Sequence, residues 1–118
     1  MPADTDDAFA RQLLELRREY LADSPKRIEE LRELMERLGR GDVAALAGCR
    51  QAFHRLAGSG GSYGFPLIST RSREAEHLIE RIFSTAQPPT PADMAAIAAA
   101  VAGIATAFDE ARRGIELS

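Results

Sequence analysis

The segment LAGCRQAFHRLA, residues 46–57, has its apolar side chains at the spacing of one helix face. With about 100° of rotation per residue and Phe53 at the centre of that face, the inward positions are Leu46, Cys49, Phe53, Leu56 and Ala57. His54 then lies about 100° from Phe53, at the edge of the buried face and half exposed. The glycine-rich run GSGGSYG at residues 58–64 predicts that this helix ends there.

Helical periodicity continues in both directions from this segment. Two apolar stripes precede it, one formed by Phe9, Leu13, Leu16 and Tyr20 and the next by Ile28, Leu31, Met35 and Leu38. Two more follow it, the first with Phe65, Ile68, Ala75, Leu78, Ile79 and Ile82 and the second with Met94, Ile97, Val101, Ile104 and Phe108. The connections are short, so consecutive helices are expected to be antiparallel neighbours.

Capping residues mark where these helices begin. Ser24 before Pro25 suits the N-cap of the second helix, and Asp42 suits the N-cap of the helix that carries His54. Thr90 and Asp93 have the spacing of a capping box for the last helix. We therefore predict an all-α fold, an up-down antiparallel four-helix bundle with an additional short N-terminal helix, forming one domain over residues 1–118.

Composition excludes several classes of function. The 15 Lys and Arg residues are mixed with 18 Asp and Glu residues, so there is no basic stripe for nucleic acid. Cys49 is the only cysteine, which excludes an intramolecular disulfide and a cysteine-based metal site. The N-terminus lacks the pattern of a signal peptide, and the apolar run at residues 94–108 is shorter than a membrane span requires. We expect a cytoplasmic protein that binds neither nucleic acid nor membrane.

The helix flank around His54 consists mostly of small residues, namely Ala47, Ala57, Gly58 and Gly61. These leave an imidazole without bulky neighbours and a backbone that another protein can approach, so we interpret the four as a docking surface. Glycine inside a helix costs about 1 kcal/mol relative to alanine, and access for a partner would account for that cost. The alternative is a surface histidine without chemistry beside an ordinary helix end.

The run from His54 to Gly64 resembles the motif of the histidine-containing phosphotransfer (Hpt) domain, H-x-L-K-G-S-S-x-x-x-G. Five positions match the motif, and they are His54, Leu56, Gly58, Ser59 and Gly64. The resemblance implies that His54 accepts a phosphoryl group from receiver-domain aspartates and returns it to them. The partners would be response-regulator receiver domains and a hybrid histidine kinase. The chain would be a monomeric carrier rather than an enzyme, with no cofactor of its own, because the receiver supplies the Mg²⁺.

Charged residues near His54 are candidates for supporting roles. Glu76 has the same angular offset from buried Ala75 as His54 has from Phe53, so it is placed to accept a hydrogen bond from the inner ring nitrogen. The alternative for Glu76 is a solvated pair with Arg73. The family's lysine, three residues after the histidine, is replaced here by Ala57. We expect Arg50 to replace its charge, with Arg55 and Arg73 as weaker candidates.

Two other functions compete with the phosphocarrier. The chain could be a helical protein-interaction module that retains the fold without being phosphorylated, an alternative that the missing lysine favours. A histidine-kinase dimerisation segment is the other, but it would have an acidic residue directly after the histidine, where this sequence has Arg55. That class would also require a nucleotide-binding domain, and the sequence has no glycine motif for ATP.

Overall fold

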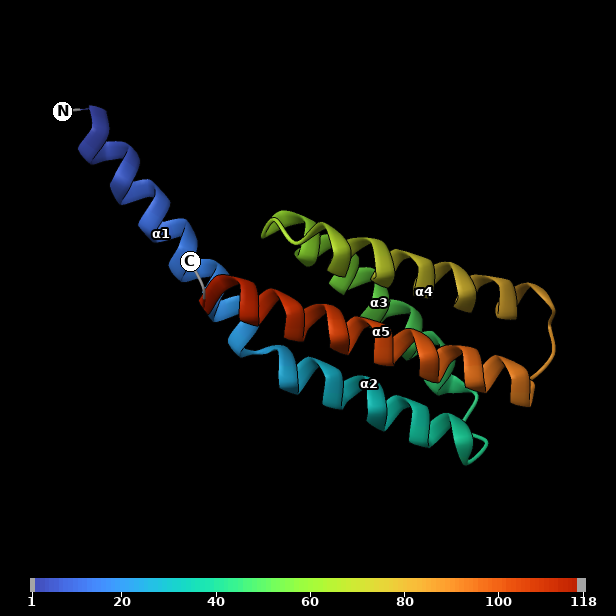
Figure 1. The fold of residues 1–118 in the computed structure, drawn as a ribbon. Helices are drawn as coiled ribbons and strands as arrows, with labels where there is room; N and C mark the ends of the chain where they lie inside the picture. Colours follow the sequence, from blue (N-terminus) through green and yellow to red (C-terminus); the bar gives the residue numbers. More distant parts are fainter. Residues whose placement is uncertain (1, 117–118) are drawn as a thin grey trace.

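The computed structural model describes the backbone of residues 2–116 and the side chains of residues 7–116. Within that range the secondary structure is entirely helical, which confirms the predicted all-α fold (Figure 1). The elements are α1 (Pro2–Ala22), α2 (Ser24–Gly39), α3 (Ala44–Ser62), α4 (Pro66–Ser84) and α5 (Pro91–Glu116).

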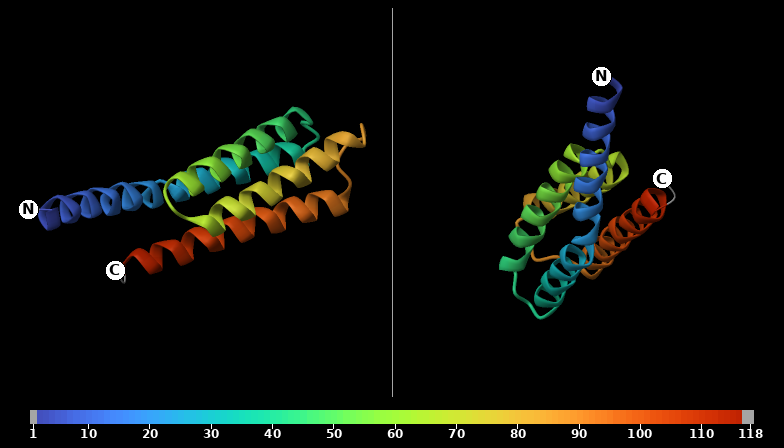
Figure 2. Two further views of the ribbon diagram at one scale, coloured as in Figure 1. Left: turned by 90° about the horizontal axis from the view of Figure 1, so that it is seen from above. Right: turned by 90° about the vertical axis from the view of Figure 1, so that its left-hand side faces the viewer.

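Helices α2 to α5 run up and down around one apolar core (Figures 1 and 2). Each packs against two others of the four, in the cyclic order α2, α3, α4, α5, and the α3–α4 interface is the most extensive. The residues predicted at the centres of the apolar stripes form this core, including Leu31, Phe53, Ile79, Ile97 and Phe108, each at most 1% exposed. The bundle is therefore held by burial of the faces that the sequence periodicity marks.

Helix α1 departs from the prediction in length and in burial. It has 21 residues, more than the 16 of α2, and it extends beyond the end of the bundle (Figure 2). Its predicted stripe is buried only at Tyr20, 4% exposed, whereas Phe9, Leu13 and Leu16 are 67%, 41% and 46% exposed. The physical reason is that α1 meets α2 and α5 only near its C-terminal end, so its first turns have no neighbouring helix to cover them.

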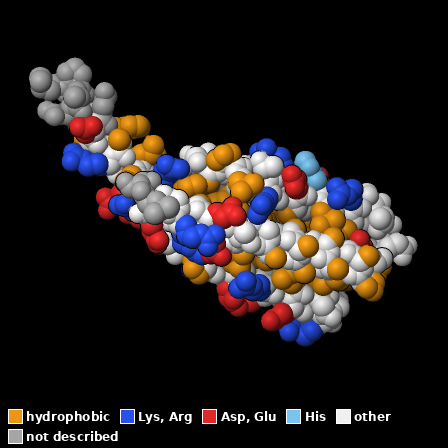
Figure 3. Space-filling model, in the orientation of Figure 1, with side chains coloured by type: hydrophobic (Ala, Val, Ile, Leu, Met, Phe, Trp, Pro, Cys, Tyr) orange, Lys and Arg blue, Asp and Glu red, His pale blue; other side chains and the backbone are white. Residues whose placement is uncertain are grey.

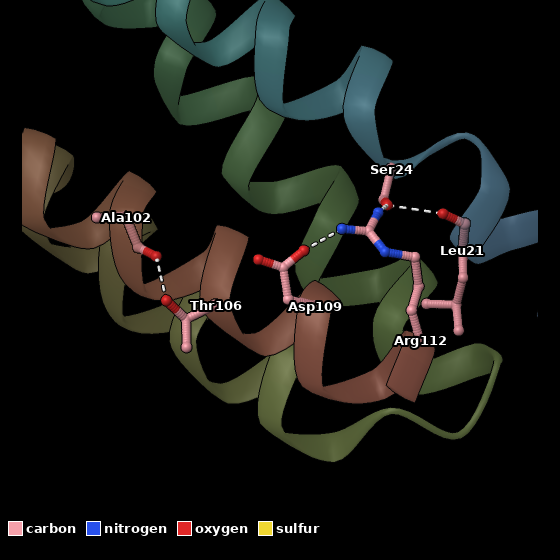
Figure 4. Close-up of polar contacts among 6 residues, drawn as sticks. All are labelled: Leu21, Ser24, Ala102, Thr106, Asp109 and Arg112. Atoms are coloured by element: carbon pink, nitrogen blue, oxygen red, sulfur yellow. Dashed lines mark hydrogen bonds and ion pairs between the residues drawn. The ribbon is translucent and has the colours of Figure 1, made fainter. Parts of the chain in front are cut away.

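A buried serine, Ser24, connects the junction between α1 and α2 to α5. The sequence had predicted that Ser24 caps α2 instead. Ser24 is the first residue of α2 and does not cap it, because its Oγ donates a hydrogen bond to the Leu21 carbonyl at 2.6 Å. Arg112 of α5 donates to the same Oγ and pairs with Asp109 (Figure 4). One hydroxyl thus joins three helices at this point.

The other two predicted caps differ in outcome. Asp42 does not cap α3, because its carboxylate accepts a hydrogen bond from Arg37 Nε at 3.0 Å instead. The capping box at the start of α5 is confirmed. The Thr90 amide lies 2.9 Å from Asp93 Oδ2, and the Asp93 amide lies 3.0 Å from Thr90 Oγ1.

The glycine-rich run does not end α3, as the sequence had predicted, but continues it to Ser62. The reason is close packing against α4. A Cβ atom added at Gly60 would lie 2.9 Å from Ile68 Cγ2 and 3.0 Å from the Ser69 amide nitrogen, so only glycine fits there. The turn follows at Gly64, whose φ of +82° suits glycine.

Helix α5 is long and apolar enough to cross a membrane by length and composition alone. In the bundle, however, its large apolar residues Ile97, Val101, Ile104 and Phe108 form part of the core. Alanines make up much of its remaining surface. Packing in the bundle thus accounts for the large apolar residues of α5, whereas many of its alanines are exposed.

Candidate functional site

His54 projects from the middle of α3, and its side chain is 75% exposed. Its Nδ1 atom lies 2.6 Å from Oε2 of Glu76 on α4, and the Glu76 side chain is only 12% exposed. An ionised carboxylate can only accept hydrogen bonds, so in a neutral imidazole Nδ1 carries the proton and Nε2 keeps its lone pair. The histidine is thereby held in one orientation with its second nitrogen available.

The antiparallel pairing of α3 and α4 brings these side chains together. One turn before His54, Arg50 Nε lies 3.7 Å from Oε1 of Glu80, which is one turn after Glu76. On the other side of His54, the Ser69 hydroxyl donates to the Ala57 carbonyl at 2.7 Å. These contacts on either side of His54 fix the register of α3 against α4, and that register places Glu76 opposite His54.

A shallow hollow of about 440 Å³ surrounds the imidazole. Its lining residues are Arg50, Gln51, His54, Arg55 and Glu76. Two arginines beside an exposed imidazole give the hollow the charge and the hydrogen-bond donors that a phosphoryl group requires. Figure 3, which draws one face of the molecule, shows a single pale-blue histidine patch at the surface of the bundle, with basic and acidic side chains near it.

Not all of the predicted residues lie at this site. Arg73 is exposed but is not among the residues that line the hollow, and Glu76 pairs with His54 instead of Arg73. Ala57 does not belong to the docking surface, because it is only 6% exposed. It lies on the side of α3 that α4 covers, where its carbonyl accepts the hydrogen bond from Ser69.

The small residues Ala47, Gly58 and Gly61 are exposed, so they leave the surface of α3 accessible around His54. A Cβ atom added at Gly58 would meet no other atom within 4 Å. This part of the predicted docking surface is therefore open to a partner.

Sequence reasoning missed two residues of the site, Gln51 and Glu80. Gln51 lines the hollow, and Glu80 pairs with Arg50. Their spacing gave a usable signal, because Gln51 is three residues before His54 and Glu80 is four residues after Glu76, so each shares a helix face with a known site residue.

Other reactive side chains lie apart from this site. Cys49 is fully buried, and burial raises the pKa of its thiol above the ordinary value. His77 is exposed on α4. Among the residues that the structure describes, no group of three or more His, Cys, Asp or Glu side chains is arranged to hold a metal ion.

Comparison with protein families matches the Hpt domain to residues 15–112, most of the chain. The chain belongs to the Hpt domain family. Hpt domains take part in histidine phosphotransfer in the phosphorelays of two-component signalling, where they interact with receiver domains and histidine kinases. The match begins close to the point where α1 joins the bundle, so the exposed Phe9 and Leu13 precede it. Comparisons with curated proteins and with solved structures gave no match.

Proposed function

We propose that this Hpt domain is a phosphocarrier that accepts a phosphoryl group on His54 from one receiver domain and passes it to another. The observation that carries the proposal is the pairing of His54 with Glu76. The imidazole is 75% exposed, yet a largely buried carboxylate 2.6 Å from Nδ1 orients it. A histidine without chemistry on a helix surface does not require such a partner.

In the transfer step, the lone pair of Nε2 attacks the phosphorus atom of a receiver phosphoaspartate. The P–O bond to the aspartate breaks as the P–N bond forms, and the aspartate leaves as a carboxylate. The return step reverses these bond changes. Phosphoryl transfer depends mainly on positioning and charge stabilisation, so a rigid nucleophile is sufficient on this side.

Charge stabilisation would come from both proteins. The receiver domain would bring the Mg²⁺ ion that neutralises the transferring group, so the carrier needs no metal or nucleotide of its own. On the carrier, Arg50 and Arg55 line the hollow beside His54 and are placed to offset the negative charge of the phosphoryl group once it is bound to His54. They would take over from the lysine that the family motif has at the position of Ala57.

The receiver would dock on the exposed part of α3 formed by Ala47, Gly58 and Gly61. Small side chains there let the receiver backbone approach the imidazole closely enough for direct transfer. We expect the carrier to act as a cytoplasmic monomer, without an intrinsic kinase activity and without nucleic-acid or membrane partners.

Transfer from a phosphorylated receiver tests the proposal directly. The wild-type chain and the His54→Gln variant are incubated with a panel of ³²P-labelled receivers, and acid-labile label on the carrier is measured. We expect label on the wild type and none on His54→Gln, with circular dichroism showing that both are folded. Equal labelling of the two proteins would exclude His54 as the acceptor. Absence of label on the wild type with every receiver would favour the interaction module.

A further inference from the structure

Two charged pairs lie one helical turn apart along the α3–α4 interface. The His54–Glu76 pair is close, at 2.6 Å, and its carboxylate is largely buried. The Arg50–Glu80 pair is longer, at 3.7 Å, and its side chains are 55% and 46% exposed. The second pair therefore holds its arginine far less firmly than the first holds its histidine.

The weakness of the Arg50–Glu80 pair follows from its exposure. Exposed ion pairs contribute only about 0.2–1 kcal/mol, because water screens the charges and both side chains lose conformational freedom. A competing anion within reach of the guanidinium is therefore able to displace Glu80. Arg50 also lines the hollow around His54, so a phosphoryl group on Nε2 would enter the space next to it.

Resting on the function proposed above, we propose that Glu80 is a positioning residue that regulates the lifetime of the phosphohistidine by competing for Arg50. Before transfer, Glu80 holds the guanidinium one turn away from the nucleophile. After transfer, the phosphoryl group and the Glu80 carboxylate share the same cation. Glu80 thus limits how strongly Arg50 stabilises the phosphorylated state.

The expected direction follows from the chemistry of hydrolysis. Water attacks phosphorus, the P–Nε2 bond breaks, its electron pair returns to the protonating imidazole, and inorganic phosphate leaves. In a loose transition state, negative charge moves from the phosphoryl oxygens toward the leaving group. A guanidinium on those oxygens therefore stabilises the ground state more than the transition state and slows hydrolysis.

The test uses a chemical phosphodonor, so that it does not depend on a receiver. Phosphoramidate transfers its phosphoryl group to the imidazole nitrogen, with loss of ammonia as the P–N bond of the donor breaks. All proteins carry His77→Gln, which leaves His54 as the one histidine able to be labelled. After removal of the donor, ³¹P NMR follows the loss of phosphohistidine in the parent, in Glu80→Gln, in Arg50→Ala and in the double variant.

We expect Glu80→Gln to lengthen the phosphohistidine half-life about two- to fivefold, and Arg50→Ala to shorten it by a similar factor, the range that exposed ion pairs support. The double variant should behave like Arg50→Ala, because Glu80 then has no arginine to compete for. Glu74→Gln removes the same charge from the same helix about 200° away from Glu76, so it should leave the half-life unchanged.

An unchanged half-life in Glu80→Gln overturns the proposal. So does an equal lengthening in the Arg50→Ala background, since it would show that Glu80 simply repels the phosphoryl group. These outcomes are separate from failure of the carrier function, which is measured by transfer from phosphorylated receivers to His54.

Discussion

Replacing Gly60 with alanine should separate α4 from α3 and destabilise the bundle, although alanine is the better helix former. The change adds one methyl group where α3 packs directly against α4. The added Cβ would lie 2.9 Å from Ile68 Cγ2 and 3.0 Å from the Ser69 amide nitrogen. The second contact is with backbone, so a rotamer change cannot relieve it and the helices must move apart.

Gly58→Ala is the matched control, because it makes the same change in the same helix at a position with no atom within 4 Å. Both variants gain about 1 kcal/mol from helix propensity. Only Gly60→Ala has the overpacking cost, roughly 1–3 kcal/mol for an added methyl group in a packed core. The difference between the variants therefore isolates that cost, and it corresponds to about 4–12 °C in melting temperature for a domain of this size.

Thermal and urea unfolding followed by circular dichroism measure this difference. We expect Gly58→Ala to melt above the wild type and Gly60→Ala to melt well below Gly58→Ala. Equal melting temperatures for the two variants would refute the packing argument. They would mean that the glycine at position 60 is not required by the approach of α4.

Three further predictions concern the site and the core. Glu76→Ala removes the hydrogen bond that orients the imidazole of His54 through Nδ1. Losing about 1.5 kcal/mol of stabilisation from this bond should slow phosphoryl transfer to His54 about tenfold. ¹⁵N NMR of the imidazole ring should show a mixture of tautomers in the variant and one tautomer in the wild type. Burial raises the pKa of Tyr20 above its ordinary value of about 10, so the contribution of Tyr20 to the free energy of unfolding should be constant below pH 10 and fall as the pH rises beyond it. Tyr20→Phe should remove this part of the alkaline fall in the free energy of unfolding. The same variant should cost about 1 kcal/mol at neutral pH, because the hydrogen bond between Tyr20 and Ser59 at 2.8 Å is lost. Cys49 is fully buried, and burial raises the pKa of its thiol. A disulfide reagent should therefore modify Cys49 only as fast as the protein unfolds. Fast labelling of the folded protein would contradict the packing described for α3.

Periodicity predicted the bundle because each of its helices places apolar residues at i, i+3 and i+4 against a neighbour. The same rule failed for α1, where Phe9, Leu13 and Leu16 share a face but are exposed. A periodic pattern shows which face of a helix is apolar. It contains no information on whether another element is long enough to cover that face.

Local propensity predicts the wrong end for α3. Glycines lower helix propensity, so the run beginning at Gly58 was predicted to be a loop. The structure continues the helix because Gly60 allows Ile68 and the α4 backbone to pack closely, and that tertiary contact outweighs the propensity. At about 100° per residue, Gly60 lies within about 40° of Phe53, so the sequence places it on the buried face, and its burial confirms this. The angle does not show how closely α4 approaches that glycine.

The site was predictable to the extent that angles on one helix determine it. His54 and Glu76 each lie about 100° from a buried residue of their helix, and these equal angles indicated that the two side chains could lie opposite each other. The same angles placed Ala57 among the inward positions, and its exposure of only 6% confirms that prediction. Its additional assignment to the docking surface is therefore wrong. The pairing of Arg50 with Glu80 depends on the register of α3 against α4, and that register is known only once both helices are placed.

Every residue that lines the hollow at His54 belongs to the α3–α4 hairpin. Proteins open locally in cooperative units, and the least stable units are those with few buried contacts. The exposed turns of α1 fit that description, and amide hydrogen exchange there should be much faster than in α3 and α4. Fraying of the N-terminal helix therefore leaves the paired hairpin closed, so a phosphoryl group on His54 would keep its surroundings while another part of the molecule unfolds and refolds.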